Sequence, residues 1–165
     1  MDIAGIIKSR RSVRKYKNKM LSEDDLEKIL EAARWAPSGL NNQPWRYLVV
    51  KESDTKNVLA KFTKYGSIIE SAPVVIAVCL FKADSYNREK DLMAIGASIQ
   101  NMLLQAYDLG LGSCWMGEIL NRKQEAADFL KLDKSLEVMA AVAFGYPDEK
   151  NKESERKPLK NLLIK

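Results

Sequence analysis

The sequence predicts a single α+β domain over residues 1–165, and three observations support this fold class. Helical patterns and strand-like apolar runs alternate along the chain, but they do not repeat as the strict strand–helix–strand units of a parallel sheet. Gly110-Leu111-Gly112 follows a predicted helix rather than a strand, so it is not the glycine signature of a dinucleotide-binding fold. No linker or repeat divides the chain, and its length suffices for a core of its own.

The first half of the chain begins with a short helix face formed by Ile3, Ile6 and Ile7. Ser22, followed by acidic residues, has the pattern of a helix N-cap and predicts a helix over 22–36, which Pro37 ends. Further along, the pattern predicts a strand at 47–50, a helix over 54–64 and a buried central strand over 73–80, because the last run is almost entirely apolar.

The second half is dominated by a helix over 88–109 that is apolar nearly all round. Such a helix is buried on more than one side, either within its domain or between subunits. Asn121 is expected to cap a helix over 122–131, and a strand is expected at 136–144. The charged stretch 148–157 precedes an apolar tail, which must be buried on the core of its own chain or across a dimer partner. The apolar residues of this tail are Leu159, Leu162, Leu163 and Ile164.

Composition narrows the possible chemistry. The chain has 27 basic and 22 acidic residues, a moderate net charge of +5, and no histidine. Without histidine, we expect no Ser-His-Asp or Cys-His catalytic arrangement. An ordinary zinc site is not expected either. Cys79 and Cys114 are isolated in apolar surroundings and are expected to be buried free thiols, which favours a reducing cytoplasm. We expect no membrane span and no signal peptide, since the apolar runs are too short.

A basic segment runs from Lys8 to Lys19, with seven basic residues and no acidic one. Its guanidinium groups surround Ser12, and guanidinium groups bind phosphate oxygens through charge-assisted, often bidentate hydrogen bonds. An ordinary solvated charged face is the alternative reading. A nucleic-acid surface is disfavoured because the acidic run Glu23-Asp24-Asp25 follows soon after. The segment therefore favours a discrete phosphate group as its ligand.

The second polar segment, Pro37 to Trp45, has more amide side chains than a simple turn requires. Its Ser, Asn and Gln residues offer donors and acceptors that would orient a planar polar ligand. Gly117, which directly follows Trp115-Met116, suggests a close approach of the backbone to a ligand. A ligand with a phosphate at one end and a polar ring system at the other is a nucleotide-like cofactor.

Five stretches of the chain, in order, resemble the nitroreductase family of FMN-dependent oxidoreductases. They are Arg10-Arg11-Ser12-Val13-Arg14-Lys15-Tyr16, Ala36-Pro37-Ser38-Gly39-Leu40-Asn41-Asn42-Gln43-Pro44-Trp45, residues 97–104, residues 110–118 and Arg156-Lys157-Pro158-Leu159. The resemblance covers nearly the whole chain. It implies a central, mostly antiparallel sheet flanked by helices, and a homodimer in which the C-terminal tail of one subunit reaches the other.

The resemblance also implies the cofactor site. Arg10, Arg11, Ser12 and Arg14 would bind the phosphate, ribityl chain and pyrimidine edge of FMN, with Arg14 our candidate for the N1–O2 edge. Pro37, Ser38, Gly39 and Asn41 would reach the flavin of the other subunit, whereas Gln43 would hold the loop and Trp45 would be core. The backbone of Met116, Gly117 and Glu118 would lie against the flavin ring near N5. One or both of Arg156 and Lys157 would complete the phosphate site, with Arg156 the favoured residue.

The implied activity is hydride transfer from NADH or NADPH to a nitroaromatic, quinone or similar small acceptor by a ping-pong mechanism, with no catalytic side chain. Other readings stay open: a flavin-binding sensor or carrier, or an enzyme of the same fold that performs reductive dehalogenation, enoate reduction or flavin destruction. The chain departs from larger family members because only residues 81–90 separate the central strand from the long helix, so a helical lid over the flavin is missing or minimal.

Overall fold

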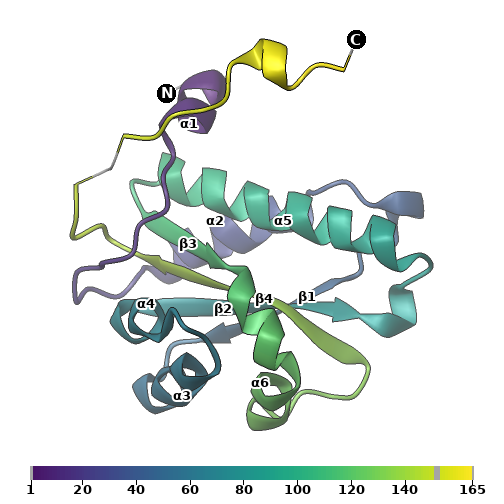
Figure 1. Ribbon diagram of the computed structural model, residues 1–165. Coiled ribbons are helices and arrows are strands. Elements are labelled where there is room, and N and C mark those ends of the chain that lie inside the picture. Colours follow the sequence, from purple (N-terminus) through teal and green to yellow (C-terminus); the bar gives the residue numbers. More distant parts are fainter. Residues whose placement is uncertain (1, 151–152, 165) are drawn as a thin grey trace.

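The computed structural model describes residues 2–150 and 153–164, and it places an antiparallel sheet between two layers of helices (Figure 1). The strand order is β1-β2-β4-β3. The strands are β1 (Trp45–Val50), β2 (Val74–Phe81), β3 (Gly112–Met116) and β4 (Leu136–Gly145). All three neighbouring pairs are antiparallel, so the predicted α+β class and antiparallel sheet are confirmed.

The helices divide between the two faces of the sheet, as Figure 1 shows. The helices are α1 (Ile3–Ser9), α2 (Glu23–Arg34), α3 (Ser53–Leu59), α4 (Gly66–Ser71), α5 (Arg88–Asp108) and α6 (Lys123–Phe129). Helices α2 and α5 pack on one face of the sheet, and α3, α4 and α6 pack on the other. Ser22 caps α2 as predicted, because its Oγ accepts a hydrogen bond from the backbone N–H of Asp25 at 3.0 Å.

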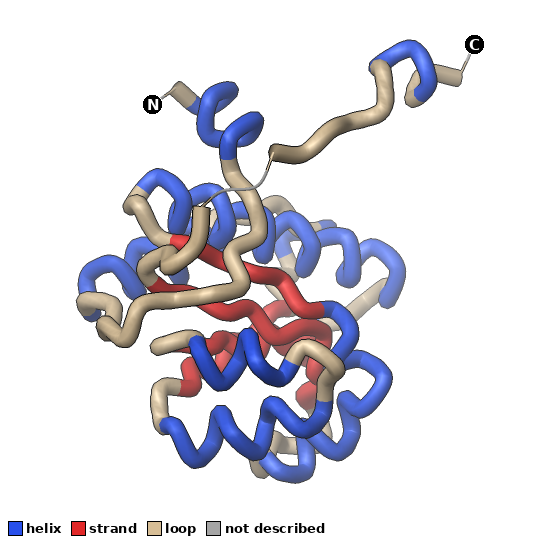
Figure 2. Tube along the Cα trace, turned by 60° about the vertical axis from the view of Figure 1, so that its left-hand side comes forward, coloured by secondary structure: helices blue, strands red, loops and turns tan. Residues whose placement is uncertain are grey.

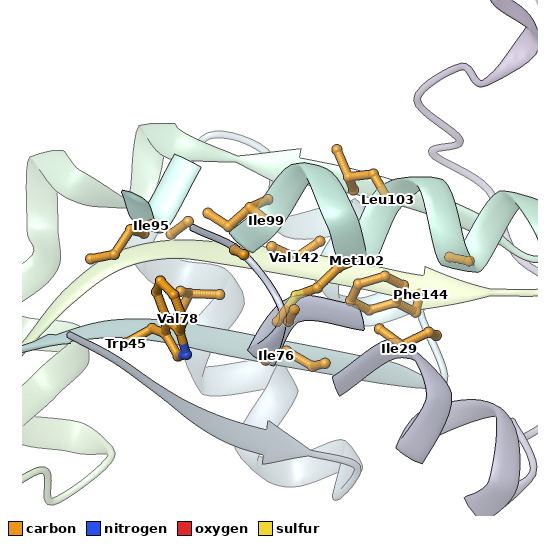
Figure 3. Packing of buried hydrophobic residues seen from close by; sticks show 14 of the residues in the cluster. Ile29, Trp45, Ile76, Val78, Ile95, Ile99, Met102, Leu103, Val142 and Phe144 are labelled. Carbon is orange, nitrogen blue, oxygen red and sulfur yellow. The ribbon is translucent and has the colours of Figure 1, made fainter. Parts of the chain in front are cut away.

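The central strand β2 supplies side chains to both layers of the core, and this explains why its sequence is a continuous apolar run. Ile76 and Val78 point toward α2 and α5, whereas Val75 and Cys79 belong to the opposite cluster. Figure 3 shows the first of these clusters between the sheet and α5. Burial on both faces of β2 therefore makes this strand the centre of the core.

Helix α5 is buried along the side that faces the sheet and exposed along part of the other side. Ile99 and Met102 are fully buried, whereas Met93 is 69% exposed. Within the chain, α5 packs against both the sheet and α2, so the prediction that this helix is buried on more than one side holds inside the domain. The side that carries Met93 stays uncovered. Among the described residues, no helix has both the length and the apolar character that a bilayer crossing requires.

Two details of the predicted elements are wrong. The predicted helix over 54–64 ends at Leu59 and continues as a 3₁₀ turn, because Thr63 and Lys64 form hydrogen bonds to the carboxylate of Glu118 instead of extending the helix. Asn121 does not cap α6. It lies in a 3₁₀ segment, where its Nδ2 donates to Glu118 Oε1 at 3.1 Å, and no side chain caps α6.

Glu137 on β4 ties the beginnings of two helices to the sheet. Its carboxylate accepts a bidentate pair of hydrogen bonds from Arg88, at 2.7 and 2.9 Å, and also contacts the ammonium group of Lys123. Hydrogen bonding to Arg88, supported by Lys123, lowers the pKa of Glu137 to about 2 although partial burial opposes this. The carboxylate therefore stays ionised far below the ordinary pKa of a glutamate.

We expect Glu137→Gln to lower the free energy of unfolding by about 1–2 kcal/mol at neutral pH, less than the pKa shift alone would give because both cations are partly exposed. A carboxylate with a depressed pKa stabilises the fold above its unfolded-state pKa, and the stabilisation is lost as the pH falls toward about 2. Urea titrations between neutral pH and pH 2 should show the wild-type advantage shrinking toward zero. Glu125→Gln, which breaks an exposed pair with Arg122, is the control, and an equal loss in both variants would contradict the prediction.

The two ends of the chain project from the same side of the domain (Figure 2). Helix α1 contains no buried residue, and the C-terminal tail extends away from the sheet. The tail's apolar side chains are exposed: Leu159 by 72%, Leu162 by 61%, Leu163 by 65% and Ile164 by 100%. The alternative in which the tail is buried on the core of its own chain is therefore wrong for these residues.

Candidate functional site

The basic segment is held against the edge strand β3. Ser12 forms a parallel bridge with Ser113, and the backbone N–H of Val13 donates to Ser113 O at 2.9 Å. Val13 sits directly over Gly112, where an added Cβ would lie 2.7 Å from the Cβ of Val13. Glycine at 112 is required for this close approach, and it allows the segment to extend the sheet by one short pairing.

The other side of the segment pairs with the chain that leaves β4. Lys17 N–H donates to Tyr146 O at 2.9 Å, and Asp148 N–H donates to Lys15 O at 3.0 Å. The backbone N–H of Arg14 donates to Glu149 Oε1 at 2.5 Å. Hydrogen bonds on both sides therefore hold the backbone of the predicted phosphate segment, while the side chain of Arg14 stays exposed.

Arg10 and Arg11 line a hollow of about 270 Å³ together with Ser113, Pro147 and the C-terminal end of α5. Burial lowers the pKa of Arg10, and the neighbouring charges of Arg11 and Arg156 lower it further. Among the described residues, Nε of Arg11 is buried without a hydrogen-bond partner. Clustered guanidinium groups with unused donors would be stabilised by an anion, so this hollow fits a phosphate group.

The polar loop after α2 has a strained backbone. Leu40, Asn41 and Gln43 have φ angles of 54°, 56° and 47°, a left-handed conformation that is unfavourable for residues other than glycine. The loop is closed by Gln43 N–H, which donates to Ser38 Oγ at 3.0 Å, and by Gln43 Nε2, which donates to Asn41 O at 3.1 Å. Gln43 thus holds the loop, as expected, and Trp45 is buried in the core.

The first part of this loop lines a second hollow of about 270 Å³. Pro37, Ser38 and Gly39 form one wall, and α5 forms the other through Lys90, Met93, Ala94 and Ala97. This hollow shares no residue with the one lined by Arg10 and Arg11. The structure therefore places the two predicted halves of the cofactor site in different hollows of a single chain.

The end of β3 brings backbone atoms to the surface. Met116 is buried, Gly117 is exposed, and Trp115 is 44% exposed beside Gly96 and Gly117. The Glu118 carboxylate lies against the turn that follows α3, where hydrogen bonds from Thr63 Oγ1 at 2.6 Å and Lys64 N at 2.8 Å lower its pKa. Only the backbone at Glu118 is thus free for the predicted contact, since its side chain has a structural role.

The remaining predicted residues, Arg156 and Lys157, lie on the exposed tail. Arg156 Nη1 donates to Glu155 O at 2.8 Å, and the charge of Arg156 is close enough to lower the pKa of Arg10. Cys79 and Cys114 are buried free thiols, as expected. Within residues 2–150 and 153–164, no group of three or more metal-ligating side chains is arranged to hold a metal ion.

Comparisons with known proteins agree with this geometry. The family model described as the nitroreductase family matches residues 7–65 and 57–146, which together include the basic segment, the polar loop and β3. The chain belongs to the nitroreductase family. The matched region covers well over half of its length and ends just before the tail.

Individual relatives of this nitroreductase-family chain cover nearly all of it. A crystal structure of a nitroreductase-type protein from Desulfovibrio desulfuricans in complex with FMN has 43% sequence identity and a TM-score of 0.95, and the match covers 100% of this chain and 96% of that one. A protein of Archaeoglobus fulgidus, described as an NADH dehydrogenase/NAD(P)H nitroreductase, is 34% identical over 88% of this chain and 86% of its own. An FMN reductase [NAD(P)H] of Bacillus subtilis is 28% identical over 93% and 70%.

The sequence analysis did not single out two residues that shape the candidate site. Ser113 holds the basic segment through its backbone, and Asn42 joins the polar loop to α5 through hydrogen bonds from Nδ2 to Asp91 Oδ1 and Asp84 O. The adjacent amides Asn41 and Asn42 were a signal that the loop carries more polar groups than a turn needs. The sequence alone gave no signal that Ser113 pairs with Ser12.

Proposed function

We propose that this chain is an FMN-dependent oxidoreductase that transfers hydride from NADH or NADPH to nitroaromatic, quinone or similar small acceptors by a ping-pong mechanism. The observation that carries the proposal is the hollow lined by Arg10 and Arg11 beside β3, in a chain that matches an FMN-bound relative over its whole length. When bound, FMN would supply the redox chemistry, by accepting and returning hydride in two half-reactions.

The residues of this chain fit that cofactor. Arg10 and Arg11 present guanidinium donors to one anion, and Ser12 and Arg14 extend the polar surface beside them. We propose that Arg156 and Lys157 complete the phosphate site, which the influence of Arg156 on Arg10 supports. These contacts would fix the phosphate end of FMN and so orient the ring that the cofactor carries.

The ring would lie against backbone rather than against an acidic side chain. Strand β3 ends at the buried Met116, and the exposed Gly117 that follows it leaves room for a ring to approach the main chain. A backbone amide can donate to a flavin nitrogen without titrating, so the reaction needs no side-chain acid at this point. This suits a chain that has no histidine.

We also propose a homodimer with FMN at the subunit interface, where Pro37, Ser38, Gly39 and Asn41 of one copy meet the flavin of the other. The separation of the two hollows within one chain supports this arrangement. Exposed apolar side chains on α1, directly after the end of α2 and on α5 supply a surface for a second copy. They include Ile3 at 72%, Trp35 at 73% and Met93 at 69% exposed.

The exposed tail would dock on the partner subunit. An open groove of about 720 Å³ lies beside β1, a strand that pairs with β2 on its other side. Leu48, Val49 and Leu130 are among the residues that line this groove, and the partner's tail would dock there.

Truncation after Pro158 removes the apolar tail residues and should convert the dimer largely to monomer at micromolar concentration, with loss of bound flavin. Sedimentation velocity would measure this, with Lys160→Ala as control. A truncated dimer that keeps its flavin would remove the case for an exchanged tail.

The test of the function is the visible spectrum of the purified protein after FMN addition and desalting, followed by anaerobic NADH or NADPH. A retained flavin band near about 450 nm that bleaches with nicotinamide is expected for a flavin reductase. A retained band that does not bleach would favour a flavin sensor or carrier, or a different electron donor. Absence of retained flavin would overturn the proposal.

We also propose that the protein acts in the cytoplasm, because its two buried cysteines are free thiols and a reducing compartment keeps thiols in this form.

A further inference from the structure

Asp91 is a buried carboxylate in the first turn of α5. The residue is only 1% exposed. Among the described residues no lysine or arginine forms a salt bridge with it. Burying an acid without a counter-ion is costly unless hydrogen bonds compensate for the lost water. If this position served only to fill the core, an apolar side chain would avoid the cost of burying a carboxylate.

Hydrogen bonds from two different loops compensate this carboxylate. Asn42 Nδ2, from the loop that follows α2, donates to Asp91 Oδ1 at 2.8 Å. Ser85 Oγ donates to Asp91 Oδ2 at 2.6 Å, and Asn87 N–H reaches the same oxygen at 3.3 Å. Burial alone would raise the pKa of Asp91, but the hydrogen bonds from Ser85 and Asn42 outweigh it and lower the pKa. The ionised Asp91 carboxylate thus accepts hydrogen bonds from both loops and holds them in place.

The loop that Asp91 anchors is the strained one. Asn42 lies between Asn41 and Gln43, both of which have positive φ angles. A non-glycine residue in the left-handed region costs on the order of a kilocalorie per mole or more, and the conformation persists only when its surroundings enforce it. Asn42 Nδ2 also donates to Asp84 O at 2.9 Å, so this one amide group joins the loop to both neighbouring segments.

The two anchored loops also touch at the proposed cofactor face. Tyr86, which follows Ser85, packs so closely on Gly39 that a Cβ added at Gly39 would lie 1.9 Å from the Tyr86 hydroxyl oxygen. Gly39 and Ser38 line the hollow beside α5. If the part of the loop that contains Asn42 shifted, Ser38 and Gly39, which face this hollow, would therefore move as well.

We propose that Asp91 is a positioning residue for the cofactor loop. It holds Ser38, Gly39 and Asn41 in the conformation that meets the flavin, by fixing Asn42 on one side and the Ser85–Asn87 loop on the other. This inference rests on the proposed role of that loop in FMN binding. Asp91 itself touches no ligand and moves no proton in the reaction.

The test compares FMN affinity and stability in matched variants of the full-length protein. Asp91→Asn keeps the shape but removes the carboxylate, and Asn42→Ala removes the partner from the loop side. Each should raise the FMN Kd about tenfold, the loss expected when a hydrogen bond to a charged group disappears. If the two residues act through one contact, the double variant should be no weaker than the worse single one.

Ser98→Ala is the control, because Ser98 is a buried residue of the same helix whose Oγ lies 2.5 Å from the hydroxyl of Tyr47 on β1. It should lower stability while leaving the FMN Kd unchanged. A wild-type FMN Kd in Asp91→Asn or Asn42→Ala, or an equal loss of affinity in Ser98→Ala, would overturn the proposal. If Asp91→Asn does not fold, Asn42→Ala alone decides. Failure of the wild-type protein to bind FMN would instead refute the proposed function.

Discussion

Replacing Arg10 with alanine is expected to raise the FMN Kd about 100-fold, because a charge-assisted hydrogen bond to a phosphate contributes about 1.5–3 kcal/mol. Arg10 lines the hollow beside β3, and its guanidinium is partly buried among other positive charges. A phosphate would relieve that repulsion, so the loss should exceed that of an exposed arginine. Fluorescence titration of the apoprotein with FMN measures it directly.

Riboflavin provides the discriminating comparison, because it carries the same ring without the phosphate. Arg10→Ala should weaken FMN binding while leaving riboflavin binding nearly unchanged, and high salt should reduce the difference. Lys28→Ala is the control, since Lys28 is exposed on α2 and forms its salt bridge with its helix neighbour Asp24. Equal losses for FMN and riboflavin would show that Arg10 does not hold the phosphate.

Phe144→Ala is expected to lower the free energy of unfolding by about 3–5 kcal/mol, the usual cost of removing a large aromatic side chain from a closed core. Phe144 on β4 is fully buried and lies among side chains from α2 and α5, including Ile29 and Met102 (Figure 3). The surrounding helices cannot collapse into the space because both also pack on β2. Urea unfolding followed by circular dichroism gives the value.

Tyr65→Ala is the matched control for that substitution, since Tyr65 is half exposed and removal of its ring leaves no closed cavity. It should cost well under half as much as Phe144→Ala. A similar cost for both variants would mean that the core between the sheet and α5 is less closely packed than the structure shows.

The long and strongly patterned elements could be predicted from the sequence. Ser22 and the acidic turn after it marked the start of α2, and the apolar run at Val74–Leu80 marked a strand buried on both faces. Each signal is local, because capping and periodicity act within a few residues. The break after Leu59 was missed because its cause is tertiary: the Glu118 carboxylate takes the backbone N–H of Lys64 and the hydroxyl of Thr63.

The candidate site was predictable in its residue types but not in its geometry. The arginines around Ser12 and the amides of the polar loop indicated a phosphate and a polar ring from their chemistry alone. The left-handed backbone at Leu40, Asn41 and Gln43 was not predictable, because no glycine marks it and distant contacts through Asn42 enforce it. Residues that act through a second residue leave little trace in one sequence.

The pairing of the basic segment has a consequence for biosynthesis. Residues 12–17 leave the ribosome well before the groups that hold them, which belong to Ser113, Tyr146 and Glu149. The separation between Arg14 and Glu149 is 135 residues, so closing this contact requires synthesis through Glu149 and is slow compared with local folding. A nascent chain that already contains α2 and β2 would therefore still lack its anion-binding hollow, and cofactor loading would have to wait until the residues up to Glu149 had been made.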